Sequence, residues 1–258
     1  HQKIDIRGAA ITLFSLSATS VSSSSSLSDT QKMNVVKSPV MRVYPVHAVT
    51  TAASISTKAE LTLIRPPLTA PALWTRYTPG PPEATQQHCK SSTMAMCQPL
   101  SASGLPFPPD IVKYMFGVSQ SEFHADLLPG SDTLTDCKNI ASIRARIIWV
   151  AGSCHLSDGV NLGSETNPVL LIVEDGHVSL ASGASLTGML VTLSRNSGLP
   201  KDIIQHATSV ITGAAVVLQD LSARSTLRIT YSKEILVTLQ NAEYTQRASF
   251  LTGSWHDF

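Results

Sequence analysis

A repeat in the C-terminal half constrains the fold of this chain more than any other sequence feature. The segment 185–193 (SLTGMLVTL) matches the segment 210–218 (VITGAAVVL), and their glycines, Gly188 and Gly213, occupy equivalent positions in the match. Short apolar strands and glycine corners that return with a period in the twenties are typical of β-solenoids. In such a fold each coil buries its apolar face against its neighbours.

A weaker third copy precedes these two. Gly163 stands one further repeat length upstream of Gly188, ahead of the apolar run 168–173, and the run 159–163 echoes 183–188. We therefore expect a mainly β chain whose C-terminal part, 143–258, is β-solenoid-like or β-helix-like. An ordinary sheet that contains two similar strands is the alternative interpretation.

Helices are expected to be few and short. The run near 109–117 opens with prolines and ends at Gly117, which is the pattern of a helix start and a helix cap. Its apolar residues Ile111, Tyr114 and Met115 share one face, and we expect that face to pack in the core. The segment 200–206 is helix-like and would bulge from one coil.

The N-terminal half differs in composition and in its pattern of apolar residues. Residues 1–33 are expected to be a connector or the remnant of an anchor helix, and residues 34–142 an extended, strand-rich and proline-rich region. Alternation of apolar and polar residues in 43–46 and 60–64 predicts two strands of a hairpin or meander. The prolines of 65–108 predict a long irregular region.

Charge and composition exclude some classes of partner. The chain has 258 residues, of which 43% are hydrophobic and 14% charged, and 19 basic residues nearly balance 18 acidic ones. A net charge of +1 provides no field that would gather nucleic acid or an anionic membrane, so neither is expected as a primary partner. Low charge with abundant Ser and Thr favours a β-rich protein outside the cytoplasm.

Four cysteines, Cys89, Cys97, Cys137 and Cys154, suggest two disulfides. No two of them have the C-x-x-C spacing of zinc ribbons or thioredoxin-like proteins. Of the three possible connectivities, Cys89–Cys97 with Cys137–Cys154 closes the shortest loops and is the one that we favour. Four free thiols in a cytosolic protein are the alternative.

Sequence motifs for catalysis are lacking. The chain contains no G-x-S-x-G, phosphate-binding loop, G-x-G-x-x-G or H-E-x-x-H, and no two of its eight histidines have helical ligand spacing. Glu174 and Asp175 share a turn and, with Asp158 on a neighbouring coil, would be candidates for a glycan-hydrolysing acid pair. Such turn residues are common in solenoids, so we expect no active site, no cofactor and no metal site, although Asp158 and Asn161 leave calcium open.

Several stretches form a consistent combination: 107–118 (FPPDIVKYMFGV), 135–137 (TDC), 148–154 (IWVAGSC), 227–231 (LRITY) and 253–258 (GSWHDF). Together with the Thr-Gly-apolar repeats, this combination resembles the ectodomain of PilX-type pilus assembly proteins, the minor-pilin-like components of type IV pili. The closing Gly-Ser-Trp-x-Asp-Phe is its most specific part. The resemblance covers about residues 105–258.

The resemblance implies a non-enzymatic protein of the bacterial envelope, periplasmic or on the cell surface. Its partners would be other minor pilins in a complex that primes pilus assembly or stays at the tip. Such proteins are anchored in the inner membrane by an N-terminal helix, which this sequence does not show, so membrane contact is expected only through such a helix in a full-length precursor. The alternatives are a secreted β-helical adhesin or glycan-active enzyme, and a component of the type II secretion pseudopilus.

Three aromatic residues, Phe250, Trp255 and Phe258, end a chain that is only 5% aromatic. We expect them to cap the open end of the solenoid, which would otherwise expose unpaired strand edges. A contact with a partner is the alternative, since Trp is a frequent anchor of interfaces.

Overall fold

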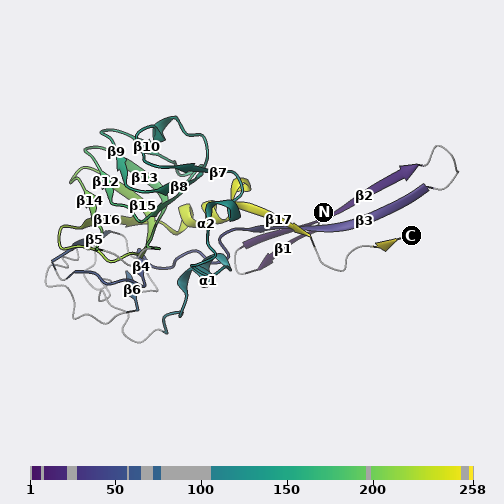
Figure 1. Ribbon diagram of the computed structural model, residues 1–258, viewed down its shortest axis with the longest axis horizontal. Coiled ribbons are helices and arrows are strands. Elements are labelled where there is room, and N and C mark those ends of the chain that lie inside the picture. Colours follow the sequence, from purple (N-terminus) through teal and green to yellow (C-terminus); the bar gives the residue numbers. More distant parts are fainter. Residues whose placement is uncertain are drawn as a thin grey trace.

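The computed structural model is mainly β, with parallel sheets and two described α-helices (Figure 1). Side chains are described only between Asn34 and Ala248, and there only within the ranges that follow. The structure describes residues 2–6, 9–21, 28–56, 58–64, 72–76, 106–195, 199–250 and 256–257.

The largest sheet is built from parallel strands. Its order is β5-β16-β15-β13-β11-β8-β7, with every neighbouring pair parallel. Its strands are β5 (Glu60–Ile64), β16 (Thr226–Tyr231), β15 (Val210–Leu218), β13 (Ser185–Leu193), β11 (Val169–Glu174), β8 (Ile147–Ala151) and β7 (Ser131–Leu134).

A second, smaller parallel sheet contains β9 (Cys154–Leu156), β12 (Val178–Leu180) and β14 (Ile203–Gln205). From β8 to β15 the chain alternates between the two sheets, and only the short β10 (Asn161–Leu162), which pairs with β13, interrupts the alternation. Apolar side chains from both sheets join one buried cluster. Within the described residues the strands do not close into a complete solenoid.

The register confirms the main repeat and corrects its upstream extension. Gly188 pairs directly with Gly213, so the match between the two segments is an alignment of neighbouring strands. Gly163 does not continue this column, because the partner of Gly188 in the preceding strand is Val169. Its neighbour Leu162 pairs with Leu186, which makes the offset here one residue shorter than between Gly188 and Gly213. The paired strands β10 and β13 are thus one residue closer in sequence than β13 and β15, and Gly163 lies at the corner between β10 and β11.

The N-terminal residues form strands, which differs from the expected connector or anchor-helix remnant. Strands β1 (Gln2–Ile6), β2 (Ala9–Val21) and β3 (Ser28–Pro39) pair antiparallel in sequence order. The ribbon of β2 and β3 extends away from the parallel sheets (Figure 1). Two C-terminal strands, β17 (Gln246–Phe250) and β18 (His256–Asp257), pair with β3.

The expected hairpin within 34–142 is wrong. Residues 60–64 do form β5, but 43–46 contain no strand, and the neighbouring strand is β4 (Val49–Thr51). Both pair in parallel with distant strands, β5 with β16 and β4 with β15, while β6 (Leu73–Thr75) pairs with β4. The sheet thus crosses the boundary that was expected at 142/143, because all three residues of β4 are buried and need neighbours on both sides.

Helix α1 (Ile111–Phe116) confirms the predicted short helix. The Asp110 carboxylate accepts the Lys113 N–H at its start, and Gly117 ends it in the left-handed conformation. Ile111 and Met115 are buried as expected, whereas Tyr114 is 46% exposed. In the described part of the chain, three single turns of 3-10 helix accompany the α-helices: η2 (Ala125–Leu127), η3 (Ile140–Ser142) and η4 (Glu243–Thr245).

Two other helical assignments differ. The helix-like segment 200–206 contains strand β14, in which Ile203 is buried, Ile204 exposed and Gln205 buried, so a period of two overrides the local propensity. Helix α2 (Lys233–Asn241), which was not predicted, packs Leu236 and Leu239 against β13 and β15. None of the described helices has the length and apolar character needed to cross a membrane.

Candidate functional site

The sulfurs of Cys137 and Cys154 lie at disulfide distance, as the favoured connectivity predicts. Cys137 follows the edge strand β7 and Cys154 begins β9, and the two side chains are 3% and 1% exposed. The bond therefore fastens the edge of the large sheet to the start of the small one. Cys89 and Cys97 lie outside the described residues.

The acidic residues considered for glycan chemistry do not come together as an acid pair. Gly159 in the Asp158 turn donates to Ser182 O at 2.9 Å, so that turn stacks on 181–184. The Glu174–Asp175 turn instead stacks on the turn before β9, where the His177 N–H donates to Ser153 Oγ at 3.1 Å. The Asp158 turn and the Glu174–Asp175 turn therefore stack on different sets of turns, so their carboxylates do not form a pair.

Glu174 and Asp175 are occupied in structural contacts. Glu174 accepts the indole N–H of Trp149 at 2.8 Å and forms an ion pair with Arg195. Asp175, at φ +55°, accepts the backbone N–H of Arg195 at 2.9 Å. Both carboxylates therefore hold the segment that leaves β13.

Arg195 extends this contact to the loop after α1. Its guanidinium donates to the carbonyl oxygens of Gln120, at 3.0 Å, and Ser121, at 3.1 Å, and to that of Phe123. In the same loop, Ser119 donates a hydroxyl and a backbone hydrogen bond to Glu122 and lowers the pKa of that carboxyl. This arrangement ties the turn after β11 to the loop that joins α1 to η2.

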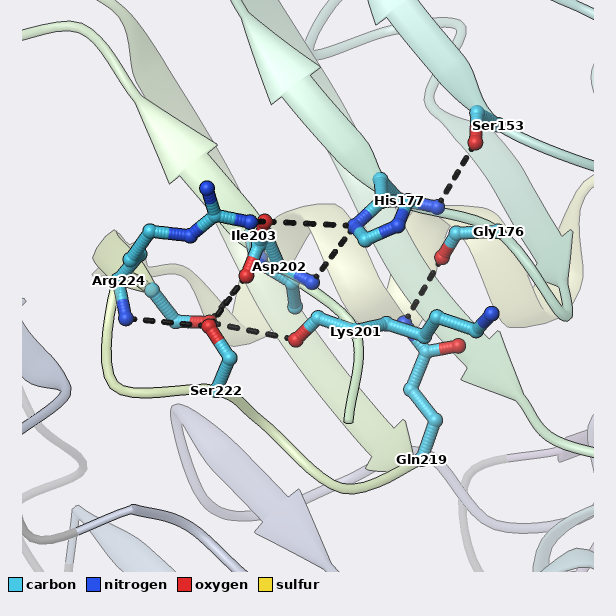
Figure 2. A network of polar contacts seen from close by, with 10 residues as sticks. Ser153, Gly176, His177, Lys201, Asp202, Ile203, Gln219, Ser222 and Arg224 are labelled. Atoms are coloured by element: carbon cyan, nitrogen blue, oxygen red, sulfur yellow. Dashed lines mark hydrogen bonds and ion pairs between the residues drawn. The ribbon is translucent and has the colours of Figure 1, made fainter. Parts of the chain in front are cut away.

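A second polar cluster gathers around Asp202, just before β14 (Figure 2). The Asp202 side chain is only 7% exposed. Its carboxylate accepts Arg224 Nη2 at 2.6 Å and the Ser222 hydroxyl. His177 Nδ1 accepts the backbone N–H of Asp202 at 3.0 Å, so the neutral ring carries its proton on Nε2. The carboxylate is thus buried but paired with a cation and hydrogen-bonded, as a buried charge requires.

The cluster connects successive turns of the chain. Figure 2 shows Ser153, His177 and Asp202 along one side, with Arg224 and Ser222 beyond Asp202. Gln219 Nε2 also donates to the carbonyl oxygen of Gly176 at 3.1 Å, which bridges non-adjacent turns.

The hydrogen bonds of this cluster have the arrangement of a structural contact and not of a catalytic triad. An acyl-transfer triad needs a hydroxyl hydrogen-bonded to the histidine ring. Ser153 Oγ instead accepts the backbone N–H of His177, and the ring nitrogen Nδ1 is occupied by the Asp202 N–H. These contacts hold neighbouring turns in register. Sequence reasoning missed the cluster, although His177 and Asp202 are separated by the same interval as the glycines of the repeat.

Of the three terminal aromatic residues expected to form a cap, only the backbone of Phe250 is described. The backbone of Phe250 in β17 pairs with Val35 of β3 in the antiparallel sheet, not with an edge of the parallel one. Trp255 and Phe258 lie outside the described residues. Asn161, considered for calcium, accepts the Ser185 hydroxyl at 2.5 Å, and the described residues contain no group of three metal-ligating side chains.

Comparison of the chain with protein-family models, with curated proteins and with solved structures gives no match.

Proposed function

We propose that this chain is a structural, non-enzymatic protein of the bacterial envelope that takes part in type IV pilus assembly within a complex of minor pilins. The observation that carries the proposal is the buried Cys137–Cys154 disulfide, since structural disulfides form and persist in oxidising compartments. The resemblance of residues 105–258 to PilX-type ectodomains gives the particular role.

The positions of the resembling stretches support this proposal. Residues 107–118 supply α1 with both of its caps, and 148–154 supply β8 and one half of the disulfide. Residues 227–231 lie in β16 of the same large sheet. Stretches that are far apart in sequence thus belong to one packed body, which is what an ectodomain needs.

We also infer that the two parallel sheets are two faces of a β-solenoid, in which successive coils of the chain contribute strands to both sheets. Three observations support this inference: the chain alternates between the two sheets, four of the strand pairs have an offset of 24 or 25 residues, and polar contacts join stacked turns. A stack of coils held by a disulfide and by turn-to-turn hydrogen bonds is a rigid scaffold, suited to a part that is built into an assembly.

Deletion of the gene in the bacterium that encodes the chain tests the proposed function. We expect loss of surface pili and of twitching motility, restored by the wild-type gene, together with co-purification of minor pilins with the tagged protein. Normal piliation and twitching in the clean deletion strain would refute the pilus role. A protein isolated from those cells with Cys137 and Cys154 as free thiols would refute the envelope location.

A further inference from the structure

A cavity of about 510 Å³ lies beside α1, between the segment 43–50, Trp74 and the segment 106–115. Its volume falls within the range of small-molecule sites, roughly 300–1,000 Å³. The contacts described above for the disulfide, Arg195 and Asp202 involve none of its lining residues.

Aromatic rings form the walls of this cavity. The Trp74 ring lies 4.8 Å from that of Phe107 and 6.3 Å, nearly edge-on, from that of Tyr114, as measured between ring centroids. Tyr44 lines the cavity as well. Among the described lining residues, four aromatic ones therefore gather here in a chain that is only 5% aromatic. Such rings offer flat apolar faces against which another ring stacks.

The part of the wall that contains Phe107 is held in place. The Arg76 guanidinium lies 5.6 Å from the centroid of the Phe107 ring and donates to the carbonyl oxygens of Pro108, at 3.2 Å, and Pro109. Prolines also fix the backbone dihedral φ of this segment. The cavity is thus shaped before any ligand arrives, which reduces the entropy lost on binding.

The described lining disfavours charged ligands. Its described residues include no Asp, Glu, Lys or Arg, and His47 among them is 2% exposed and packed 5.0 Å from the Trp74 ring, as measured between ring centroids. An ionised ligand group would therefore lose its hydration without finding a partner charge among these residues, at a large cost in free energy.

We propose that this cavity binds a neutral, mainly apolar, ring-containing small molecule. Its rings pack against the side chains of Trp74, Phe107 and Tyr114, which line the cavity. Val46 and Tyr114, each 46% exposed, stand at the mouth. The proposal does not depend on the pilus role.

Prodan, a neutral naphthalene with one ketone oxygen, is a suitable fluorescent probe. Titrated with the full chain, it should show saturable binding with a blue-shifted emission. Val46→Asp, which places a charge at the mouth, should weaken this binding by about tenfold or more. Val210→Asp is the matched control, because Val210 is 39% exposed at the start of β15 and does not line the cavity.

Three results would overturn the proposal: no saturable binding by the wild-type chain, equal binding by wild type and Val46→Asp, or equal weakening by Val46→Asp and Val210→Asp. Displacement of prodan by a proline-rich peptide at similar concentration would also overturn it, in favour of a peptide site. Circular dichroism of both variants confirms that each chain is folded.

Discussion

Gly213 lies directly beside Gly188 in the parallel pairing of β13 with β15, so closely that a Cβ at position 213 would overlap the carbonyl oxygen of Gly188. Both glycines also have positive φ, +135° at Gly213 and +143° at Gly188, a region that other residues rarely adopt. The glycines of the repeat therefore exist for two reasons: backbone conformation and close approach of neighbouring strands.

Gly213→Ala should consequently destabilise the protein by about 3 kcal/mol or more, since backbone strain and backbone overlap act together. Urea unfolding followed by circular dichroism measures the change. Gly130→Ala is the matched control, because Gly130 has φ +65° but nothing within 4 Å of its added Cβ, and it should cost only about 1 kcal/mol. Equal losses in the two variants would contradict the close-approach explanation.

The relation of Gly188 to Gly213 could be predicted from sequence because it is periodic. The same holds for α1, whose start and end carry local signals, Asp110 and Gly117. Strand β4 could not be predicted in this way, since it becomes a strand only through pairing with β15, which lies in the distant C-terminal half. The prediction that Gly163 continues the column of Gly188 and Gly213 was wrong, because the offset between paired strands is one residue shorter at β10.

The polar cluster shows why sites are harder to predict than strands. His177, Asp202 and Arg224 match no motif as single residues, and their relation emerges only once the turns are stacked. The Cys137–Cys154 pair, by contrast, could be favoured from sequence because a short loop restricts its partners. The aromatic cavity assembles Tyr44, Trp74 and Phe107 from three separate segments, which no local pattern reveals.

Removal of the disulfide should lower stability without changing the fold of the sheets. The bond closes a loop with a sequence separation of 17, for which chain-entropy arguments give about 3 kcal/mol. The double variant Cys137→Ser/Cys154→Ser should lose about this free energy of unfolding in urea. Because the variant lacks this bond, a reductant can no longer lower its stability by breaking it. A free energy of unfolding equal to that of the wild type would contradict the stabilising role of the disulfide.

The Asp202 carboxylate should contribute to stability because it is buried and accepts the hydrogen bonds of Ser222 and Arg224. Asp202→Asn keeps the shape but removes the charge opposite Arg224 and one acceptor, and we expect a loss of about 1–3 kcal/mol. Asp158→Asn, at an exposed turn residue, should stay within about 0.5 kcal/mol of the wild type. Thermal unfolding of both variants measures the difference, and a neutral Asp202→Asn would refute the role of the cluster.

Two phenols, the buried Tyr231 and the partly buried Tyr244, make stability fall at alkaline pH. Burial raises the pKa of Tyr231 to about 12 and that of Tyr244 to about 12, from an ordinary value of 10.0. Between these values the unfolded chain loses phenolic protons that the folded chain keeps. Because the folded state then binds more protons, the free energy of unfolding decreases as the pH rises from 10 towards 12.

Tyr244→Phe should make this decrease shallower, since one of the two groups no longer ionises. At neutral pH the same variant should cost about 1 kcal/mol, because it removes the hydrogen bond from the Tyr244 hydroxyl to Pro168 O at 2.7 Å. Tyr114→Phe, at a site that is 46% exposed, is the control and should leave the slope as in the wild type. Urea midpoints at pH 8, 10 and 11 measure the slopes, and an unchanged slope in Tyr244→Phe would show that this phenol is not the group responsible.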